Sequence, residues 1–119
     1  MSWTYLNDIF IPKEEVRISP FDRGFLFGDG VYEVIPVYES KAFLLKDHIS
    51  RLERSLIQTG INKPKAWNDI PQIIDKLIKK NLFLKGISKY FHNIKVFCFH
   101  YHSLAFIIVN TRLVISGLD

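Results

Sequence analysis

The sequence predicts an α+β fold in which two helices pack on a mostly antiparallel sheet. Residues 31–38 (VYEVIPVY) alternate in the manner of a strand. Two later segments, 45–59 and about 70–81, repeat apolar residues at helical spacing. Because the connections between these segments are short, one layer of strands covered by helices is the architecture they favour.

Size and composition predict one globular domain. The chain has 119 residues, of which 48% are hydrophobic and 24% are charged, and these values exclude a disordered or collagen-like chain. The single cysteine, Cys98, excludes an internal disulfide and a cysteine-rich zinc site, so a reducing, cytoplasmic setting is expected. The opening MSWTYLNDIF does not read as a signal peptide, and the longest nearly apolar stretch, 96–109, is too short and too polar to span a bilayer.

The net charge of +4 is compatible with nucleic-acid binding. The basic residues are scattered, however, and the densest group lies on and just after a predicted helix: Lys76, Lys79, Lys80 and Lys85. A solvated helix face explains that group more simply. We therefore expect neither a nucleic acid nor a membrane as a partner.

A β-hairpin is predicted at the start of the chain. Short β-prone runs at 4–6 and 9–11 flank Asn7 and Asp8, a pair suited to a tight turn.

The strand over 31–38 is the strongest strand signal. Pro36 has no N–H to donate, so this strand should lie at a sheet edge or carry a bulge there. Glu39 and Ser40 then form a turn, and 41–44 returns as a partner strand.

Two helices are predicted next. The first, over 45–59, has one apolar stripe and stops at Gly60. The second runs over about 70–81, with Asn68 or Asp69 as its cap and Pro71 in its first turn. Its predicted buried face consists of Ile70, Ile73, Ile74, Leu77 and Ile78.

Composition changes at Gly86. Residues 1–86 hold 11 of the 12 acidic residues and all five prolines, whereas 87–119 is rich in histidine and phenylalanine. Strands are predicted at 94–102 and 104–109, and the alternation places Phe97 and Phe99 on one face and Val96, Cys98 and His100 on the other. Whether these strands join the sheet is left open.

The glycine-rich segment 22–33 (DRGFLFGDGVYE) is the most unusual stretch. Gly24, Gly28 and Gly30 permit positive φ and close approach of the backbone to a ligand, and consecutive N–H groups could bind an anion. No Gly-Lys-Ser/Thr follows, so it is not a P-loop. A tight structural turn explains the spacing equally well.

Two further groups could carry chemistry. His48, Arg51 and Ser55 follow one line of the first helix, and arginine can grip a phosphate or carboxylate with two hydrogen bonds. A solvent-facing flank is the alternative. The histidines His92, His100 and His102 lack an acidic neighbour, so we expect no metal site there.

The segments DRGFLFGDGVYE and HISRLERS (48–55), in this order and at this separation, resemble the class IV (fold-type IV) pyridoxal-phosphate aminotransferases, and most of all the D-amino-acid aminotransferases. The resemblance runs from about residue 5 to Gly86. It implies that Arg51 holds the cofactor phosphate and that His48 lies close to the cofactor. It also implies that Tyr32 and Val34, on one face of their strand, line the substrate pocket.

The resemblance implies a cytoplasmic, homodimeric transferase that uses pyridoxal 5'-phosphate to move an amino group between a D-amino acid and a 2-oxo acid. The family's catalytic lysine has no counterpart here, so no catalytic residue is assigned and the chain alone should not catalyse the reaction. We interpret 1–86 as the N-terminal domain, 87–119 as an atypical tail for which a frameshift is our hypothesis, and the lysine-bearing domain as absent. The alternatives are a fragment of a branched-chain aminotransferase or of an aminodeoxychorismate lyase, and a non-enzymatic remnant.

Overall fold

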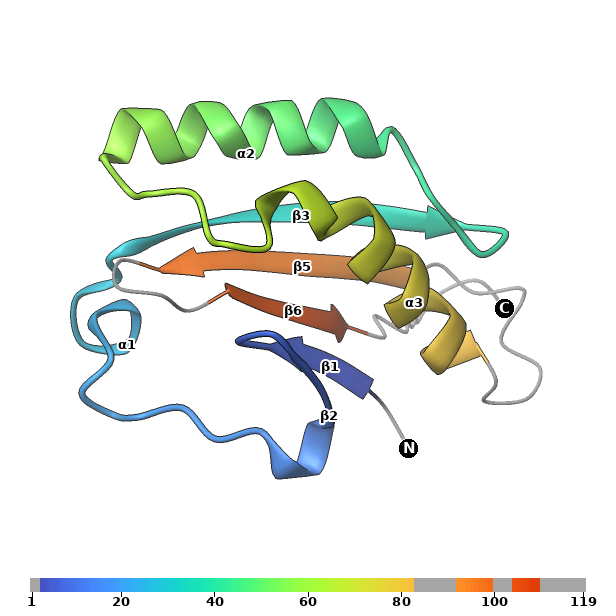
Figure 1. The fold of residues 1–119 in the computed structure, drawn as a ribbon, viewed down its shortest axis with the longest axis horizontal. Coiled ribbons are helices and arrows are strands. Elements are labelled where there is room, and N and C mark those ends of the chain that lie inside the picture. The colour runs from blue at the N-terminus through green and yellow to red at the C-terminus, as the bar shows by residue number, and fades with distance from the viewer. Residues whose placement is uncertain (1–2, 83–91, 100–103, 110–119) are drawn as a thin grey trace, which may run out of the picture.

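A computed structural model describes residues 3–82, 92–99 and 104–109 of the chain (Figure 1). Within these residues, six strands form one sheet in the order β2-β1-β6-β5-β3-β4, and each neighbouring pair runs antiparallel. The strands are β1 (Trp3–Leu6), β2 (Ile9–Pro12), β3 (Gly30–Tyr38), β4 (Lys41–Ala42), β5 (His92–Phe99) and β6 (Leu104–Val109). The helices are α1 (Arg23–Phe27), α2 (Leu45–Thr59) and α3 (Ile70–Leu82), with single 3₁₀ turns at Lys13–Glu15 and Trp67–Asp69.

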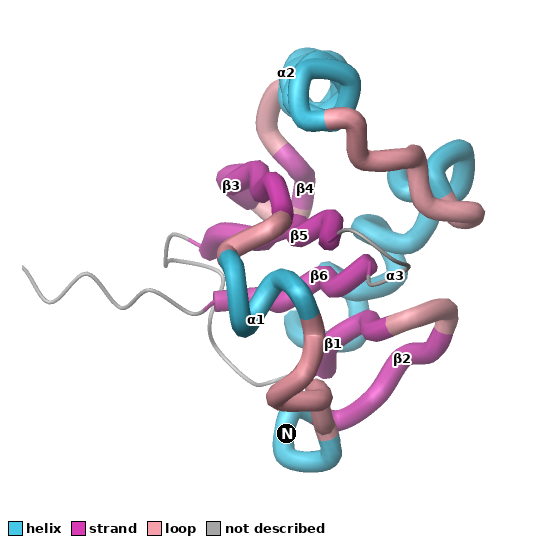
Figure 2. Tube along the Cα trace, turned by 90° about the vertical axis from the view of Figure 1, so that its left-hand side faces the viewer, coloured by secondary structure: helices cyan, strands magenta, loops and turns pink. Residues whose placement is uncertain are grey.

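The two long helices pack on the sheet, which confirms the predicted α+β architecture. Helix α2 runs alongside β3, and α3 contacts β1 and β4 (Figure 1). Seen from the end of the molecule, α3 lies on one side of the strands and α2 lies beyond β3 and β4 (Figure 2).

The opening hairpin is confirmed. Strands β1 and β2 pair from Trp3 opposite Pro12 to Leu6 opposite Ile9. Asn7 and Asp8 between them have φ values of 46° and 72°, the left-handed conformation that a two-residue hairpin turn requires and that these two residue types tolerate.

Strand β3 is confirmed, and Pro36 lies where its missing N–H removes no backbone hydrogen bond between β3 and β5. The return strand β4 is shorter than the predicted 41–44, because Leu44 turns the chain with a φ of 50° just before α2. As a result β4 pairs only with Val37 and Tyr38, and the rest of that side of β3 is a sheet edge. The Phe43 N–H donates to the Pro36 oxygen at 2.8 Å, so the nitrogen of Pro36 also faces this outer side and not β5.

Both long helices match their predicted spans. Helix α2 ends at Gly60, whose φ of 68° provides the left-handed stop. Helix α3 follows directly on the 3₁₀ turn that contains Asn68 and Asp69, and Pro71 lies in its first turn. Each residue of its predicted face is buried: Ile70, Ile73, Ile74, Leu77 and Ile78.

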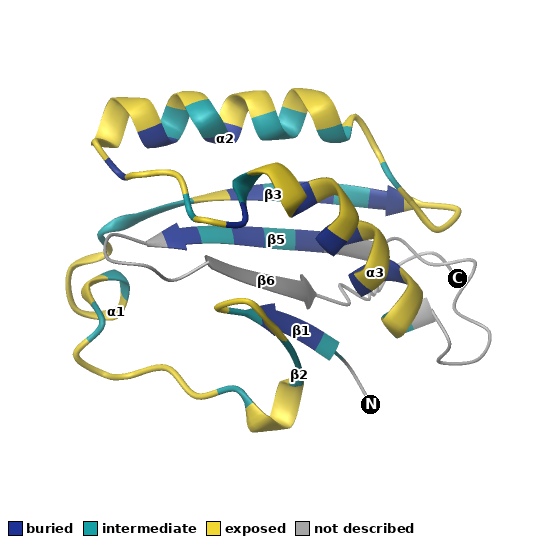
Figure 3. Cartoon of the chain, in the orientation of Figure 1, coloured by how far each residue is buried: buried dark blue, intermediate teal, exposed yellow. Residues whose placement is uncertain are grey.

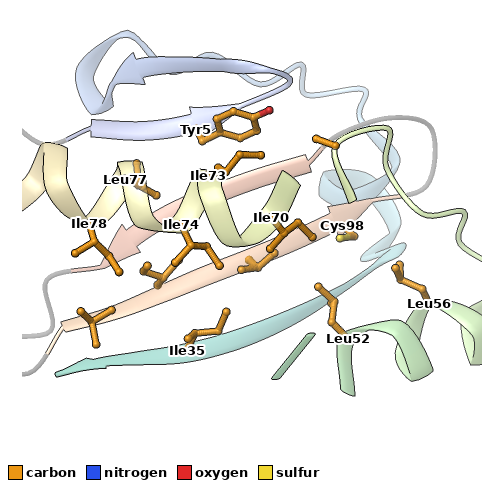
Figure 4. Packing of buried hydrophobic residues seen from close by; sticks show 14 of the residues in the cluster. Tyr5, Ile35, Leu52, Leu56, Ile70, Ile73, Ile74, Leu77, Ile78 and Cys98 are labelled. Carbon is orange, nitrogen blue, oxygen red and sulfur yellow. The ribbon is translucent and has the colours of Figure 1, made fainter. Parts of the chain in front are cut away.

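The core lies between this helical layer and the middle of the sheet (Figures 3 and 4). Ile35 on β3 and Ile94 on β5 are opposite one another and are at most 1% exposed. Leu52 from α2 and Ile74 from α3 close the same cluster from the helix side.

The compositional change at Gly86 does not coincide with an end of the sheet. Strands β5 and β6 lie in its middle, between β1 and β3. Val96 and Cys98 are buried on the helix side, and Phe97 alternates to the other face, as predicted. His100 and His102 lie outside the described residues, and the division of the chain at Gly86 stays a prediction.

The glycine-rich segment forms a short structural turn. The Asp22 side chain accepts a hydrogen bond from the Gly24 N–H at 2.8 Å and begins α1, and Gly28 ends it with a φ of 63°. The N–H groups of Gly28, Asp29 and Gly30 donate to backbone carbonyls of the same segment. The anion-binding alternative is therefore not supported, because its donors are already used.

Candidate functional site

The candidate site is centred on the carboxylate of Glu33, in the middle of β3. Its side chain is 5% exposed and faces α2. Its Oε2 accepts a hydrogen bond from the Arg51 Nε at 2.8 Å, and its Oε1 accepts one from the Arg51 Nη2. His48 Nδ1 lies 3.3 Å from Oε1, and the Val34 N–H donates to the same oxygen at 3.3 Å.

The helical repeat brings His48 and Arg51 to Glu33. They are three residues apart on α2, so both side chains project toward the adjacent strand. Ser55, the third member of the predicted line, donates its hydroxyl to the Arg51 backbone oxygen at 3.2 Å and does not reach the cluster. Two of the three aligned residues therefore form the site.

The charges in this cluster stabilise one another. Burial alone would raise the pKa of Glu33, but hydrogen bonds from Arg51 and His48, the positive charge of Arg51 and the Val34 N–H outweigh that effect and lower it. The hydrogen bond to Glu33 and the negative charge of Glu33 in turn raise the pKa of Arg51. Glu33 is therefore ionised, and Arg51 is charged, throughout the physiological range.

Arg51 has donors left over for an anion. A guanidinium carries five N–H groups, and Glu33 occupies the Nε–H and one Nη2–H. The Arg51 side chain is 59% exposed, and among the described residues no acceptor is found for Nη1. The outward Nη1–Nη2 end can thus grip a phosphate with two parallel hydrogen bonds, so the residues present fit the phosphate of the cofactor that the family resemblance implies.

The other predicted pair lies on the opposite face of β3. Tyr32 is 66% exposed there, and its ring lies 6.0 Å from the ring of Phe97 on β5. Val34 is half-buried on the same face, opposite Lys95. The common face predicted for Tyr32 and Val34 is confirmed. The structure does not bring this pair into the Glu33 cluster, because successive residues of a strand point to opposite faces.

Glu33 itself was not singled out from the sequence. It shares a face with Val31, Ile35 and Val37, and a lone acid on an apolar strand face indicates a buried charge that needs partners. That signal was available, but the partners lie 15 and 18 residues away and only the packing of α2 on β3 identifies them.

In the part of the chain that the structure describes, no three metal-binding side chains come together. None of the described helices combines the length and apolar character needed to cross a membrane.

Comparison with known proteins assigns the family. The family model described as amino-transferase class IV matches residues 30–98, which include β3, α2, α3 and most of β5. The chain belongs to the class IV aminotransferases.

Relatives within this family carry different names. The D-alanine aminotransferase of Staphylococcus epidermidis is 33% identical over 86 residues, which are 72% of this chain and 30% of the relative. The aminodeoxychorismate lyase of Bacillus subtilis is 42% identical over 77 residues, which are 65% of this chain and 26% of the relative. The chain thus spans about 30% of the length of the curated relatives it matches.

Solved structures confirm the fold. The branched-chain amino acid aminotransferase from Escherichia coli superposes with a TM-score of 0.77 at 14% identity, over 91% of this chain and 40% of that one. The superposed share exceeds 1–86, so it includes part of the compositionally distinct tail.

Proposed function

We propose that the chain is the N-terminal part of a D-amino-acid aminotransferase-like enzyme. That enzyme moves an amino group between a D-amino acid and a 2-oxo acid with pyridoxal 5'-phosphate. The D-alanine aminotransferases among its relatives, at 33% and 35% identity, support this substrate class. The observation that carries the proposal is the outward end of Arg51, a charged two-hydrogen-bond donor held at the edge of β3.

Each candidate residue has one role in this proposal. Arg51 binds the cofactor phosphate through Nη1 and Nη2, and His48 lies next to it across Glu33. Tyr32 and Val34 form a wall of the substrate pocket on the open face of the sheet. The bound cofactor supplies the electron sink for the α-carbon chemistry.

The chain by itself contributes half of a site. No residue of it matches the lysine that holds the cofactor in the family, so we propose that it binds the phosphate group without catalysing transfer. The proposal also includes the division into residues 1–86 and an atypical tail over 87–119, a homodimer in the full-length family member, and a cytoplasmic location.

Binding of pyridoxamine 5'-phosphate tests the phosphate role, because this probe has no aldehyde to react with surface lysines. Calorimetric titration should show binding of the phosphorylated probe and none of pyridoxamine. Arg51→Gln should abolish that binding. Arg54→Gln, at an exposed position on the same helix, is the matched control and should leave it intact. Equal binding by wild type and Arg51→Gln would contradict the proposal.

A turnover assay tests the second part. With D-alanine, 2-oxoglutarate and pyridoxal 5'-phosphate, the isolated chain should form no pyruvate above the rate of the cofactor alone. Enzyme-dependent pyruvate formation would show that the chain has a complete site.

A second candidate function is suggested by the 42% identity to the aminodeoxychorismate lyase of Bacillus subtilis. In that case the open face of β3 would accept aminodeoxychorismate in place of a D-amino acid. Saturation-transfer NMR of the chain loaded with pyridoxamine 5'-phosphate can separate the two candidates. Preferential contact of the Tyr32 ring with D-alanine supports the aminotransferase, and contact only with aminodeoxychorismate supports the lyase.

A further inference from the structure

We propose that Glu33 is a positioning residue: it clamps the guanidinium of Arg51 so that the phosphate-binding end points outward before any ligand arrives. This inference rests on the proposed phosphate role of Arg51 and assigns Glu33 a function that the sequence did not suggest.

The orientation of the pair is the first argument. Glu33 receives the Nε and Nη2 side of the guanidinium, with one hydrogen bond to each carboxylate oxygen. A planar guanidinium held by this side has its direction fixed, since rotation about the last side-chain bonds would break both hydrogen bonds. The remaining Nη1 donors necessarily point away from β3.

The rigidity of the clamp is the second argument. Glu33 is 5% exposed and lies in a strand that pairs with β5 along its length. Its Oε1 also accepts the Val34 N–H at 3.3 Å and has His48 Nδ1 at the same distance. Four donors thus surround one carboxylate, so the carboxylate cannot rotate without losing several of them.

The Val34 hydrogen bond shows why the clamp lies at this position. Along β3, the N–H groups of Tyr32 and Val34 and the nitrogen of Pro36, which carries no hydrogen, face the side that β4 leaves largely unpaired. The Glu33 carboxylate accepts one of these edge donors itself. The carboxylate therefore accepts a backbone N–H at the open edge of β3 and also holds Arg51.

Comparison with a surface ion pair distinguishes a clamp from an ordinary contact. Glu53 pairs with Lys63, but these side chains are 38% and 46% exposed, and exposed pairs contribute little. Ordering the long Arg51 side chain costs conformational entropy. The buried partner Glu33 offsets this cost during folding, so the free energy of ligand binding does not include it. Removal of Glu33 should therefore weaken phosphate binding although Glu33 need not touch the phosphate.

The first measurement follows Arg51 directly, without a ligand. In ¹⁵N-labelled protein, the Arg51 Nε–H signal should exchange slowly with water and show restricted motion. In Glu33→Gln it should exchange as fast as the signal of exposed Arg54. Glu53→Gln is the matched control and should leave the Arg51 signal unchanged. An Arg51 signal that is equally protected in wild type and Glu33→Gln would overturn the inference.

The second measurement is the affinity for pyridoxamine 5'-phosphate of folded protein. Glu33→Gln should bind it about tenfold more weakly, by analogy with the lower end of the loss found when a partner that orients a metal ligand is removed. Glu53→Gln should bind like wild type. If Glu33 only ties α2 to the sheet, Glu33→Gln will be less stable but its folded form will bind with unchanged affinity, and the positioning role is refuted.

The two proposals fail in different ways. If wild type shows no phosphate-dependent binding, the proposed function fails, while the Nε–H signal still decides whether Glu33 clamps Arg51. If Glu33→Gln does not fold, Arg51→Lys takes its place. It keeps the charge and lacks the fork, so binding as tight as in wild type would show that a fixed guanidinium is not needed and would overturn the inference.

Discussion

Replacement of Ile94 by alanine tests whether β5 belongs to the core. Ile94 is fully buried opposite Ile35, although it lies in the part of the chain whose composition is atypical. Ile94→Ala removes three carbons, which at roughly 0.8 kcal/mol per methylene amounts to about 2.4 kcal/mol of lost burial. The cavity left behind increases this cost, so we expect a loss of about 3–4 kcal/mol in the free energy of unfolding.

Urea unfolding followed by tryptophan fluorescence measures this loss. Ile74→Ala, on the facing helix α3 and 1% exposed, should have a similar cost. Lys95→Ala, on the other face of β5 and half-buried, should change stability by about 0.5 kcal/mol or less. If Ile94→Ala has no effect while Ile74→Ala has its full cost, β5 does not pack under the helices and the central position of the tail strands is wrong.

Three further predictions follow from single sites. Burial raises the pKa of Cys98 to about 12 from an ordinary 9.0. At pH 8 the Cys98 thiol should therefore react with a thiol reagent about a thousandfold more slowly in the native protein than in urea. Equal rates would mean that β5 does not pack against the helices. The pKa of Glu33 in the folded protein is lowered from its ordinary 4.5, so the stabilisation by ionised Glu33 is complete above pH 4.5 and is lost as the pH falls through the lower folded pKa. The unfolding curves of wild type and Glu33→Gln should therefore converge on acidification. A stability difference that stays constant with pH would contradict this prediction. Gly60→Ala places a residue with a Cβ atom at a φ of 68° and should lower the free energy of unfolding by about 1 kcal/mol. Gly60→Asn should have a smaller effect, because asparagine tolerates the left-handed conformation. Equal losses would indicate that the left-handed conformation is not the cause.

Local chemistry explains what the sequence could predict. The hairpin at Asn7 and Asp8, the stop at Gly60 and the apolar face of α3 each depend on residues within one turn or one helix, so they can be derived without tertiary information. The end of β4 could not be predicted in this way. It depends on Leu44, a residue whose type gives no signal for the left-handed conformation it adopts.

Long-range pairing explains what the sequence could not predict. The order of the sheet places β5 and β6 between β1 and β3, and residues 87–119 contain little turn chemistry to indicate which strands they would join. Similarly, His48 and Arg51 were aligned from their helical spacing, but their common partner became evident only when α2 was packed on β3.

The alternation of β3 links both halves of the candidate site. Tyr32 and Val34 face the open side of the sheet, and Glu33 between them faces α2, so three consecutive residues provide the substrate wall and the arginine clamp. A slip of one residue in the pairing of β3 with β5 would exchange these faces: it would expose Glu33 to the open side and bury Tyr32 under α2. Arg51 would lose its partner at the same time. The buried residues Ile35 and Val37, which oppose such a slip because it would expose them, therefore also protect the geometry of the site.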